Sequence, residues 1–344
     1  MRELDIIRII PGYACNLKCK YCFQLDKDKK PDFGMTEAGL KSILEVIKEQ
    51  LVYKSIEILF YGGEVLLFWD RLKYIIEAAE KLEMNGNVPR FHLISNGRLL
   101  TSDIINFCNE HNVGICVSYD GINSAKVRGY DPMEKKALLY SVKKLSIHAT
   151  FSAWNYPLDY VDSLNAFSIE YAKKNGHPPN INGDFIYDFH GIQKMDPARI
   201  NKEINTIMDR YINYCNNPDD EYLSSYLLIR YMAHYIFQMG DPETEPMCNW
   251  RNVAYLTTDG QIILCSNSCK IIGKYEDDKN LEKCFEYHNP TPELRKSLCK
   301  DCNAWFLCRG GCSFMDNDTR IKNLCPIIKA GISPVIERIA RSIK

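Results

Sequence analysis

Short runs of branched and aromatic residues alternate with amphipathic stretches from the start of the chain to about residue 190. This alternation predicts repeated β-α units on a parallel sheet. The strands are predicted at Ile6–Ile10, Ser55–Tyr61, Phe91–Ile94, Gly114–Tyr119, His148–Ala153 and Asn180–Tyr187. Because a complete barrel of this type has eight such units, these six predict an α/β fold built on a partial (β/α)6 TIM-like barrel.

Amphipathic stretches between the strands predict the helices of these units. They are expected near Thr36–Gln50, Trp69–Leu82, from Thr101 onward, and at Met133–Leu145, Leu158–Lys174 and Pro197–Tyr214. A further helix, 221–239, lies between turns that contain proline and glycine, and the second turn marks a domain boundary. We therefore expect a barrel at 1–215, a helical linker at 216–246, a cysteine-rich domain at 247–326 and a closing helix at 327–344.

Composition narrows the classes of function. Lys plus Arg, 43 in number, nearly balance the 44 Asp plus Glu among 344 residues, so no strong field favours nucleic acid or an anionic membrane. The first ten residues lack the basic and apolar regions of a signal peptide, and no apolar run reaches the roughly 18 residues of a membrane span. We expect a cytoplasmic protein.

Fifteen cysteines are many for such a chain, and their placement is uneven. In a cytosolic protein they favour metal or redox chemistry over disulfides. Three lie together at Cys15, Cys19 and Cys22, just after the first predicted strand. Three thiolates hold a four-iron cluster but leave one iron open for a small-molecule ligand. A partial zinc site or a chance spacing of cysteines is the alternative.

This loop, with Tyr21 before its last cysteine, resembles the signature loop of the radical S-adenosylmethionine (radical SAM) superfamily. The resemblance implies that the open iron chelates the amino and carboxylate groups of S-adenosylmethionine. After the second strand, Gly62, Gly63 and Glu64 resemble the family's glycine-glycine-glutamate motif, which meets the methionine amino group. The following residue is Val65 where the family usually has proline.

Further resemblances follow the third and fourth strands in the family's order. Ser95-Asn96-Gly97 resembles a Thr-Asn-Gly motif, and Ser118-Tyr119-Asp120-Gly121 resembles a Ser-Leu/Ile-Asp-Gly segment. Arg128 matches a family arginine that reaches the cofactor carboxylate. The residues that the resemblance assigns to S-adenosylmethionine are Tyr21, Gly62, Gly63, Glu64, Ser95, Asn96, Ser118, Asp120 and Arg128.

A second cysteine array matches the SPASM extension of radical enzymes that mature peptides and proteins. The resemblance implies two auxiliary four-iron clusters, so three 4Fe-4S clusters in all, with S-adenosylmethionine on the first. One auxiliary cluster would take Cys248, Cys265 and Cys312, and the other would take Cys299, Cys302, Cys308 and Cys325. The cluster with Cys248, Cys265 and Cys312 needs a fourth ligand, which is Cys269, Cys284 or an open site. Two zinc sites are the alternative.

The resemblance implies reductive cleavage of S-adenosylmethionine to a 5'-deoxyadenosyl radical and an oxidative change, such as a crosslink, in a ribosomally made peptide. Sulfatase maturases carry an aspartate where this chain has Ser266, which argues against formylglycine formation. Three alternatives remain: formylglycine formation, a small-molecule radical oxidoreductase, and a non-catalytic iron-sulfur or zinc module.

Partners and a catalytic base are also expected. The early first cluster leaves no room for a leader-binding domain, which suggests a separate recognition protein for the peptide's leader. The electron donor would be a flavodoxin or ferredoxin. Asp184 and Asp188, near the sixth strand, are weak candidates for a base, since solvated loop carboxylates are common.

Overall fold

The computed structural model describes most of the barrel and part of the cysteine-rich region. The described residues are 3–22, 32–186, 188, 194–218, 220–238, 253–265, 270–275, 291–308, 310–312 and 315–342. The predictions made for Cys248, Ser266, Cys269 and Cys284 lie outside these ranges.

Six parallel strands form the body of the sheet, in the chain order that the sequence predicts. The strands are β1 (Ile6–Ile10), β2 (Glu57–Phe60), β3 (Arg90–Ser95), β4 (Gly114–Ser118), β5 (Leu145–Phe151) and β6 (Asn180–Phe185). Each pairs in parallel with the next, from β1 at one side to β6 at the other. The predicted partial barrel is therefore confirmed.

Alternate burial along the strands separates the two faces of the sheet. In β5, Leu145, Ile147, Ala149 and Phe151 are buried, and the residues between them are half-buried. The buried side packs against the helices, because the Tyr160 hydroxyl on α6 (Pro157–Asn175) donates to the carbonyl oxygen of Ile147 at 2.9 Å. The intervening residues, which include polar ones, face the concave side of the sheet.

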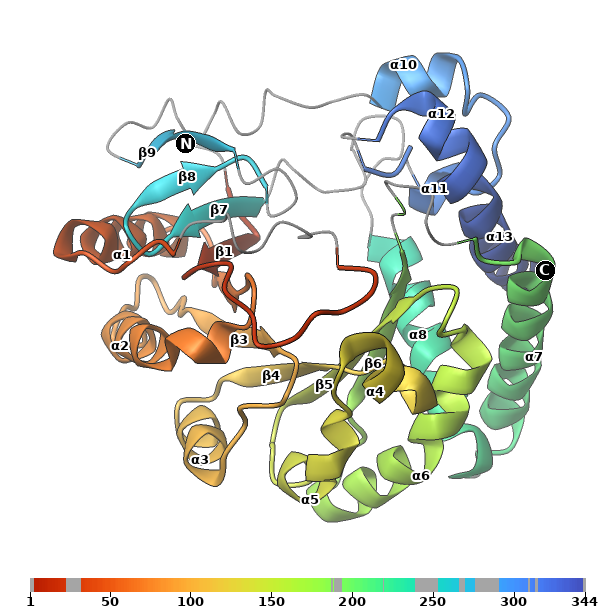
Figure 1. Cartoon of the computed structure of the whole chain (residues 1–344), viewed down its shortest axis with the longest axis horizontal. Helices are drawn as coiled ribbons and strands as arrows, with labels where there is room; N and C mark the ends of the chain where they lie inside the picture. Colours follow the sequence, from red (N-terminus) through yellow and green to blue (C-terminus); the bar gives the residue numbers. More distant parts are fainter. Residues whose placement is uncertain are drawn as a thin grey trace.

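The sheet continues beyond β1 into the region where the sequence predicts a cysteine-rich domain. β7 (Val253–Thr257) pairs in parallel with β1, and β8 (Gln261–Ile263) and β9 (Ile271–Lys274) follow in antiparallel order. Figure 1 shows this extension beside β1. Gly260, with φ +85°, turns the chain between β7 and β8 next to Gly39 of α1 (Glu37–Leu51). Cys265 lies two residues after the end of β8, before β9, and is buried.

Helices follow the strands, and most of them cover the outer face. Besides α1 and α6 they are α2 (Trp69–Ala79), α3 (Ser102–Glu110), α4 (Ser124–Arg128), α5 (Lys136–Leu139), α7 (Pro197–Asn216) and α8 (Leu223–Gln238). Figure 1 shows α1, α2 and α3 beside the first strands and α6, α7 and α8 around the last two. The Thr36 hydroxyl accepts from the N–H of Gly39 at 2.9 Å, so it caps α1 as the sequence predicts.

The predicted helix 133–145 is wrong in extent. A 3-10 turn at Pro132–Lys135 leads into the four-residue α5, and β5 already begins at Leu145. The apolar residues at 145 and 147 alternate with polar ones, and Leu145 pairs with Ile115 in the sheet. Strand pairing therefore overrides the helical periodicity of this segment.

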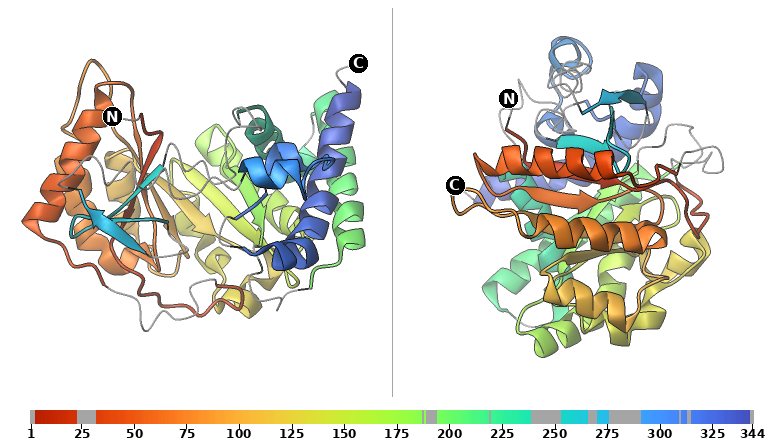
Figure 2. Two further views of the ribbon diagram at one scale, coloured as in Figure 1. Left: turned by 90° about the horizontal axis from the view of Figure 1, so that it is seen from above. Right: turned by 90° about the vertical axis from the view of Figure 1, so that its left-hand side faces the viewer.

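The C-terminal helices lie at the β6 side of the sheet. They are α10 (Thr291–Lys296), α11 (Trp305–Cys308), α12 (Asn317–Thr319) and α13 (Cys325–Ser342), with a π-helical turn, η6 (Arg320–Leu324), between the last two. α13 packs along α7, and Figure 2 shows from above how the strands curve between α1 and this helix pair. Within the described ranges, no helix has both the length and the apolar character needed to cross a bilayer.

Candidate functional site: a cysteine loop at the carboxyl edge of the sheet

The cysteine loop, residues 11–22, leaves β1 at the carboxyl edge of the sheet. Cys15, Cys19 and Cys22 are each half-buried on it. The N–H of Cys22 donates to the carbonyl oxygen of Cys19 at 3.1 Å, which closes a turn between the last two cysteines. Because the carboxyl ends of parallel strands meet at one edge, the loops after β2, β3 and β4 converge on the same place.

The glycine-glycine-glutamate segment lies directly against this loop. The N–H of Gly63 donates to the Gly12 carbonyl at 3.1 Å, and the N–H of Glu64 donates to the Ala14 carbonyl at 2.8 Å. A β-carbon at position 63 would lie 2.1 Å from the Ala14 oxygen, and one at position 62 would lie 2.4 Å from the Gly12 oxygen. Only glycine permits so close an approach of the two backbones.

Glu64 is buried and surrounded by donors from the third strand's end. Its Oε1 accepts from the Ser95 hydroxyl at 2.8 Å, and its Oε2 accepts from the N–H of Asn96 at 2.8 Å. Burial nevertheless raises the pKa of Glu64 above its ordinary value, because these hydrogen bonds only partly offset the loss of water. A desolvated carboxylate is stabilised by a cation beside it, and an ammonium group meets that requirement.

Asn16, which the sequence reasoning did not single out, joins these residues to the cysteine loop. Its Oδ1 accepts from the Asn96 side-chain amide at 2.8 Å. Asn96 therefore contacts Glu64 through its backbone and the cysteine loop through its side chain. The position of Asn16 directly after Cys15 is the one signal in the sequence that points to it.

A second group of polar residues lies at the other end of the cysteine loop. The Tyr21 hydroxyl donates to Asp120 Oδ2 at 2.5 Å and accepts from Arg128 Nη1. Arg128 Nη1 lies 3.5 Å from the same Asp120 oxygen. Ser118, two residues before Asp120, ends β4 with a half-buried side chain opposite His148.

The electrostatics of this group keep Tyr21 neutral and Arg128 charged. Burial raises the pKa of Tyr21 well above its ordinary value, and the nearby Arg128 offsets only part of the effect. Burial alone would lower the pKa of Arg128, but Tyr21 and Asp120 outweigh it and hold that pKa above its ordinary value. The hydroxyl therefore stays a donor, and the guanidinium stays a cation, at neutral pH.

Polar residues also gather on the concave face of β4, β5 and β6. The His148 Nδ1 lies 2.8 Å from Asn182 Oδ1, and its Nε2 lies 3.8 Å from Asp184 Oδ2. Cys116, on the same face, has its pKa raised to about 12, first by burial, while Arg128 lowers it and Asp184 raises it. Asp184 thus belongs to a polar cluster open to the barrel interior, of which the sequence reasoning missed His148.

The other candidate carboxylate, Asp188, lies beside the C-terminal region. Asp188 is buried, and its carbonyl oxygen accepts from the Asn323 side-chain amide at 3.4 Å. Asn323 lies on η6, so this contact joins the segment after β6 to the turn before α13. The backbone of Asp188 is thus anchored beside the C-terminal region, whereas Asp184 pairs with His148.

Four thiols of the second cysteine array act on one another. The pKa of Cys308 is raised to about 12 by burial and then by the neighbouring thiols of Cys325, Cys299 and Cys302. Burial and neighbouring thiols likewise raise the pKa values of Cys299 and Cys325. Thiols that oppose one another's ionisation are stabilised as thiolates by a metal among them, so this donor set fits an iron-sulfur cluster.

These four are the residues that the resemblance assigns to one auxiliary cluster, and the assignment stays a prediction. Among the described residues, no three Cys, His, Asp or Glu side chains stand at positions where they could ligate one metal ion together. The thiols of Cys15, Cys19 and Cys22 share one loop without such a geometry. Cys265 and Cys312, assigned to the other auxiliary cluster, are both buried.

A buried arginine holds the chain around Cys312. Arg320, 3% exposed on η6, donates from Nε to the Gly310 carbonyl at 2.6 Å and from Nη2 to the Cys312 carbonyl at 3.1 Å. Its Nη1 donates to Asn317 Oδ1 at 2.5 Å. π-Helical turns are frequent at functional sites, and this one positions the guanidinium beneath a cysteine that is a candidate ligand.

We expect Arg320→Met to lower the free energy of unfolding by about 3 kcal/mol, because it leaves buried carbonyl oxygens without donors. Anaerobic urea unfolding, followed by tryptophan fluorescence, measures the change. Lys322→Met is the matched control on the same turn, since Lys322 is exposed and its 3.7 Å ion pair is with Asp318, which is also exposed. Equal stability of the two variants would contradict the anchoring role of Arg320.

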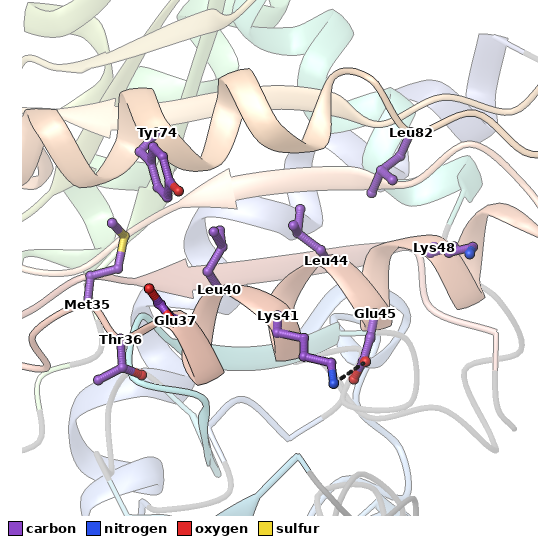
Figure 3. A pocket seen from close by; sticks show the side chains of 10 residues that line it. All are labelled: Met35, Thr36, Glu37, Leu40, Lys41, Leu44, Glu45, Lys48, Tyr74 and Leu82. Carbon is purple, nitrogen blue, oxygen red and sulfur yellow. Dashed lines mark ion pairs between the residues drawn. The ribbon is translucent and has the colours of Figure 1, made fainter.

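A groove of about 600 Å³ lies away from this site, between α1 and α2 on the outer face. Figure 3 shows its lining. Leu40 and Leu44 of α1 face Tyr74 of α2 across it, and Lys41 pairs with Glu45 at its rim. It contains no residue that the sequence resemblance assigns to a cofactor.

The comparison with known families agrees with the geometry of the carboxyl edge. The model of the "Radical SAM superfamily" matches residues 9–159, the span from β1 to the start of α6. Residues 9–159 are a radical SAM domain. This span holds the cysteine loop and all the contacts just described at the ends of β2, β3 and β4.

Two curated relatives match along nearly the whole chain. The radical SAM cyclopropyl synthase TigE of Paramaledivibacter caminithermalis is 21% identical, over 98% of this chain and 75% of its own length. The cysteine-type anaerobic sulfatase-maturating enzyme of Clostridium novyi is 23% identical, over 91% of this chain and 88% of its own length. The chain is thus related to radical SAM maturases.

Two solved structures share the fold. The structure of anSMEcpe with bound AdoMet has a TM-score of 0.69 at 19% identity, and the match covers 98% of this chain and 100% of that one. Streptococcus suis SuiB bound to its precursor peptide SuiA has a TM-score of 0.59 at 16% identity, over 95% of this chain and 74% of that one. The chain therefore shares the fold of these two proteins, and its radical SAM domain is that of an enzyme.

Proposed function

We propose that this radical SAM enzyme reductively cleaves S-adenosylmethionine and oxidatively modifies, by crosslinking, a ribosomally made peptide. The observation that carries the proposal is the convergence of Glu64, Ser95 and Asn96 on the cysteine loop. These residues come from the ends of two strands, β2 and β3, and meet the loop after β1 where the resemblance places the amino group of the cofactor.

The chain's own residues fit this cofactor. Glu64 offers a desolvated carboxylate for the ammonium group, and Arg128 offers a buried guanidinium for the carboxylate group. When bound, the first cluster and S-adenosylmethionine supply a hydrogen-abstracting radical, and the auxiliary clusters supply a sink for the electron that an oxidised product loses. Gly62 and Gly63 keep the space beside the cysteine loop free of side chains.

The peptide would bind on the concave face of the sheet, and a base on that face would accept the proton that the peptide loses on oxidation. His148 and Asp184 lie together on the strands next to the carboxyl edge, and Asp184 keeps its place as the candidate base. The four mutually interacting thiols of the second array support an oxidative outcome, since the resemblance assigns them together to one auxiliary cluster.

The substrate class draws on the relatives as well as on the site. SuiB binds a precursor peptide, and anSMEcpe has been solved with a peptide and AdoMet together. Formylglycine formation is the second candidate, favoured by the identity to a sulfatase-maturating enzyme. Ser266, in place of the aspartate that serves as a base in that class, favours crosslinking instead. The proposed setting is the cytoplasm, with a flavodoxin or ferredoxin as reductant and a separate protein that recognises the leader peptide.

Anaerobic reconstitution tests the first part of this proposal. About twelve irons per chain, with formation of 5'-deoxyadenosine after addition of dithionite and S-adenosylmethionine, is the expected result for three four-iron clusters. Co-expression with a short peptide encoded beside the gene should then lower the peptide's mass by about two hydrogens per crosslink, by conservation of atoms in an oxidative coupling. About four irons, or zinc in place of iron, would remove the auxiliary clusters and the oxidative chemistry.

A further inference from the structure

The cysteine loop is tied to α4 at three points. The N–H of Lys20 donates to the Val127 carbonyl at 2.9 Å, and the Cys19 thiol lies 3.9 Å from the Arg128 carbonyl oxygen. The third contact is the bond from the Arg128 guanidinium to the Tyr21 oxygen. The first contact joins backbone to backbone and fixes where the helix lies. The third contact fixes where the guanidinium points.

Tyr21 is the centre of a hydrogen-bond network, called the relay below, that runs from Arg128 through Asp120 after β4 to Thr150 on β5. Its hydroxyl accepts from Arg128 and donates to Asp120, which is fully buried. The other carboxylate oxygen of Asp120, Oδ1, accepts from the N–H of Thr150 on β5 at 3.2 Å. The carboxylate is therefore anchored in the sheet, and the tyrosine bridges it to the cysteine loop.

This relay uses only one end of the Arg128 guanidinium. The contacts to Tyr21 and Asp120 are both made by Nη1. Among the described residues, the Nε of Arg128 is buried without a hydrogen-bond partner. A buried donor without an acceptor is unfavourable unless a ligand supplies one, and a carboxylate is the ligand group that a guanidinium binds best.

We propose that Tyr21 and Asp120 are positioning residues that hold the Arg128 guanidinium at a fixed place relative to the cysteine loop. The inference rests on the proposed function, because the ligand carboxylate is that of S-adenosylmethionine. The metal site and the carboxylate-binding group then keep one separation before the cofactor binds, and binding does not have to order Arg128. Tyr21 positions Arg128 through its hydroxyl group, and this role is separate from any contact that its ring makes.

Binding of S-adenosylmethionine to the reconstituted enzyme, measured anaerobically by equilibrium dialysis without reductant, tests this inference. Tyr21→Phe and Asp120→Asn should each raise the dissociation constant about tenfold while leaving the iron content unchanged. Asp120→Asn leaves one acceptor oxygen in place of two, so the Tyr21 hydroxyl and the N–H of Thr150 can no longer both donate to this side chain, and the sequence of the cysteine loop is unchanged. Tyr171→Phe is the matched control, since its hydroxyl donates to the Val142 carbonyl at 2.6 Å elsewhere in the core. This control should bind like the wild type.

The same measurement in an enzyme that lacks Arg128 shows whether Tyr21 acts by positioning Arg128 or by contacting the cofactor directly. In an Arg128→Met enzyme, adding Tyr21→Phe should change the dissociation constant by less than about twofold, because the residue through which Tyr21 acts is absent. An undiminished effect in that background would overturn the inference. So would wild-type binding by Tyr21→Phe, or loss of iron from both relay variants, which would show that the hydroxyl serves only to fold the loop.

The same measurements separate this inference from the proposed function. A wild-type enzyme that binds no S-adenosylmethionine would overturn both. A wild-type enzyme that binds and cleaves it, beside a Tyr21→Phe variant of equal affinity, would overturn the inference alone. Cleavage without any change in a co-expressed peptide would count against the peptide substrate and leave the role of Tyr21 standing.

Discussion

Replacing Cys15, Cys19 and Cys22 together by alanine is expected to abolish formation of 5'-deoxyadenosine. These three thiols share one short loop, and they are the only cysteines of the cysteine loop. Without them the first cluster has no protein ligands, so the iron content should fall from about twelve to about eight per chain. Iron and sulfide analysis, together with chromatography of 5'-deoxyadenosine, measures both effects.

The fold should survive this replacement. The loop is placed by backbone bonds, among them those from Glu64 to Ala14 and from Lys20 to Val127, and alanine keeps all of them. Near-ultraviolet circular dichroism of the metal-free protein should therefore match the wild type. Cys215→Ala is the control, since Cys215 is exposed and lies in neither cysteine array. A triple variant that still forms 5'-deoxyadenosine would refute the assignment of the first cluster.

Much of the barrel could be predicted because its strands are short and separated by clear helical segments. β1 was predicted with the bounds that it has, since its branched residues stand directly before the turn-forming start of the cysteine loop. The helix predicted at 133–145 failed because local periodicity cannot show that Leu145 pairs with Ile115. Long-range pairing also explains why β7 was missed, since β1, its partner, lies more than two hundred residues earlier.

The candidate site shows the same division. The cysteine spacing and the glycine-glycine-glutamate segment could be read from the sequence because they are contiguous. Two hydrogen bonds, between Asn16 and Asn96 and between Tyr21 and Asp120, join segments that are far apart in the chain. No local sequence pattern predicts them. His148 was missed because a half-buried histidine on a strand looks like any other polar residue of an alternating pattern.

Gly63→Ala is the second change with a large expected effect. The new β-carbon would lie 2.1 Å from the Ala14 carbonyl oxygen and 2.5 Å from that of Tyr13. Backbone atoms cannot move aside as a flexible side chain can, so the cysteine loop and the segment at Glu64 must separate. The hydrogen bond from the N–H of Glu64 to the Ala14 carbonyl, 2.8 Å long, would break.

A displacement of about 1 Å at a reacting centre costs about a hundredfold in rate, so formation of 5'-deoxyadenosine should fall by about that factor. The iron content should stay near that of the wild type, because the three cysteines remain. Gly176→Asn is the matched control: this glycine ends α6 with φ +75°, has no atoms within 4 Å of an added β-carbon, and suits asparagine. If Gly63→Ala keeps activity within threefold of this control, the close contact between the two segments is not required for the chemistry. A hundredfold loss at unchanged iron content would instead show that the glycine serves the cofactor site rather than assembly of the cluster.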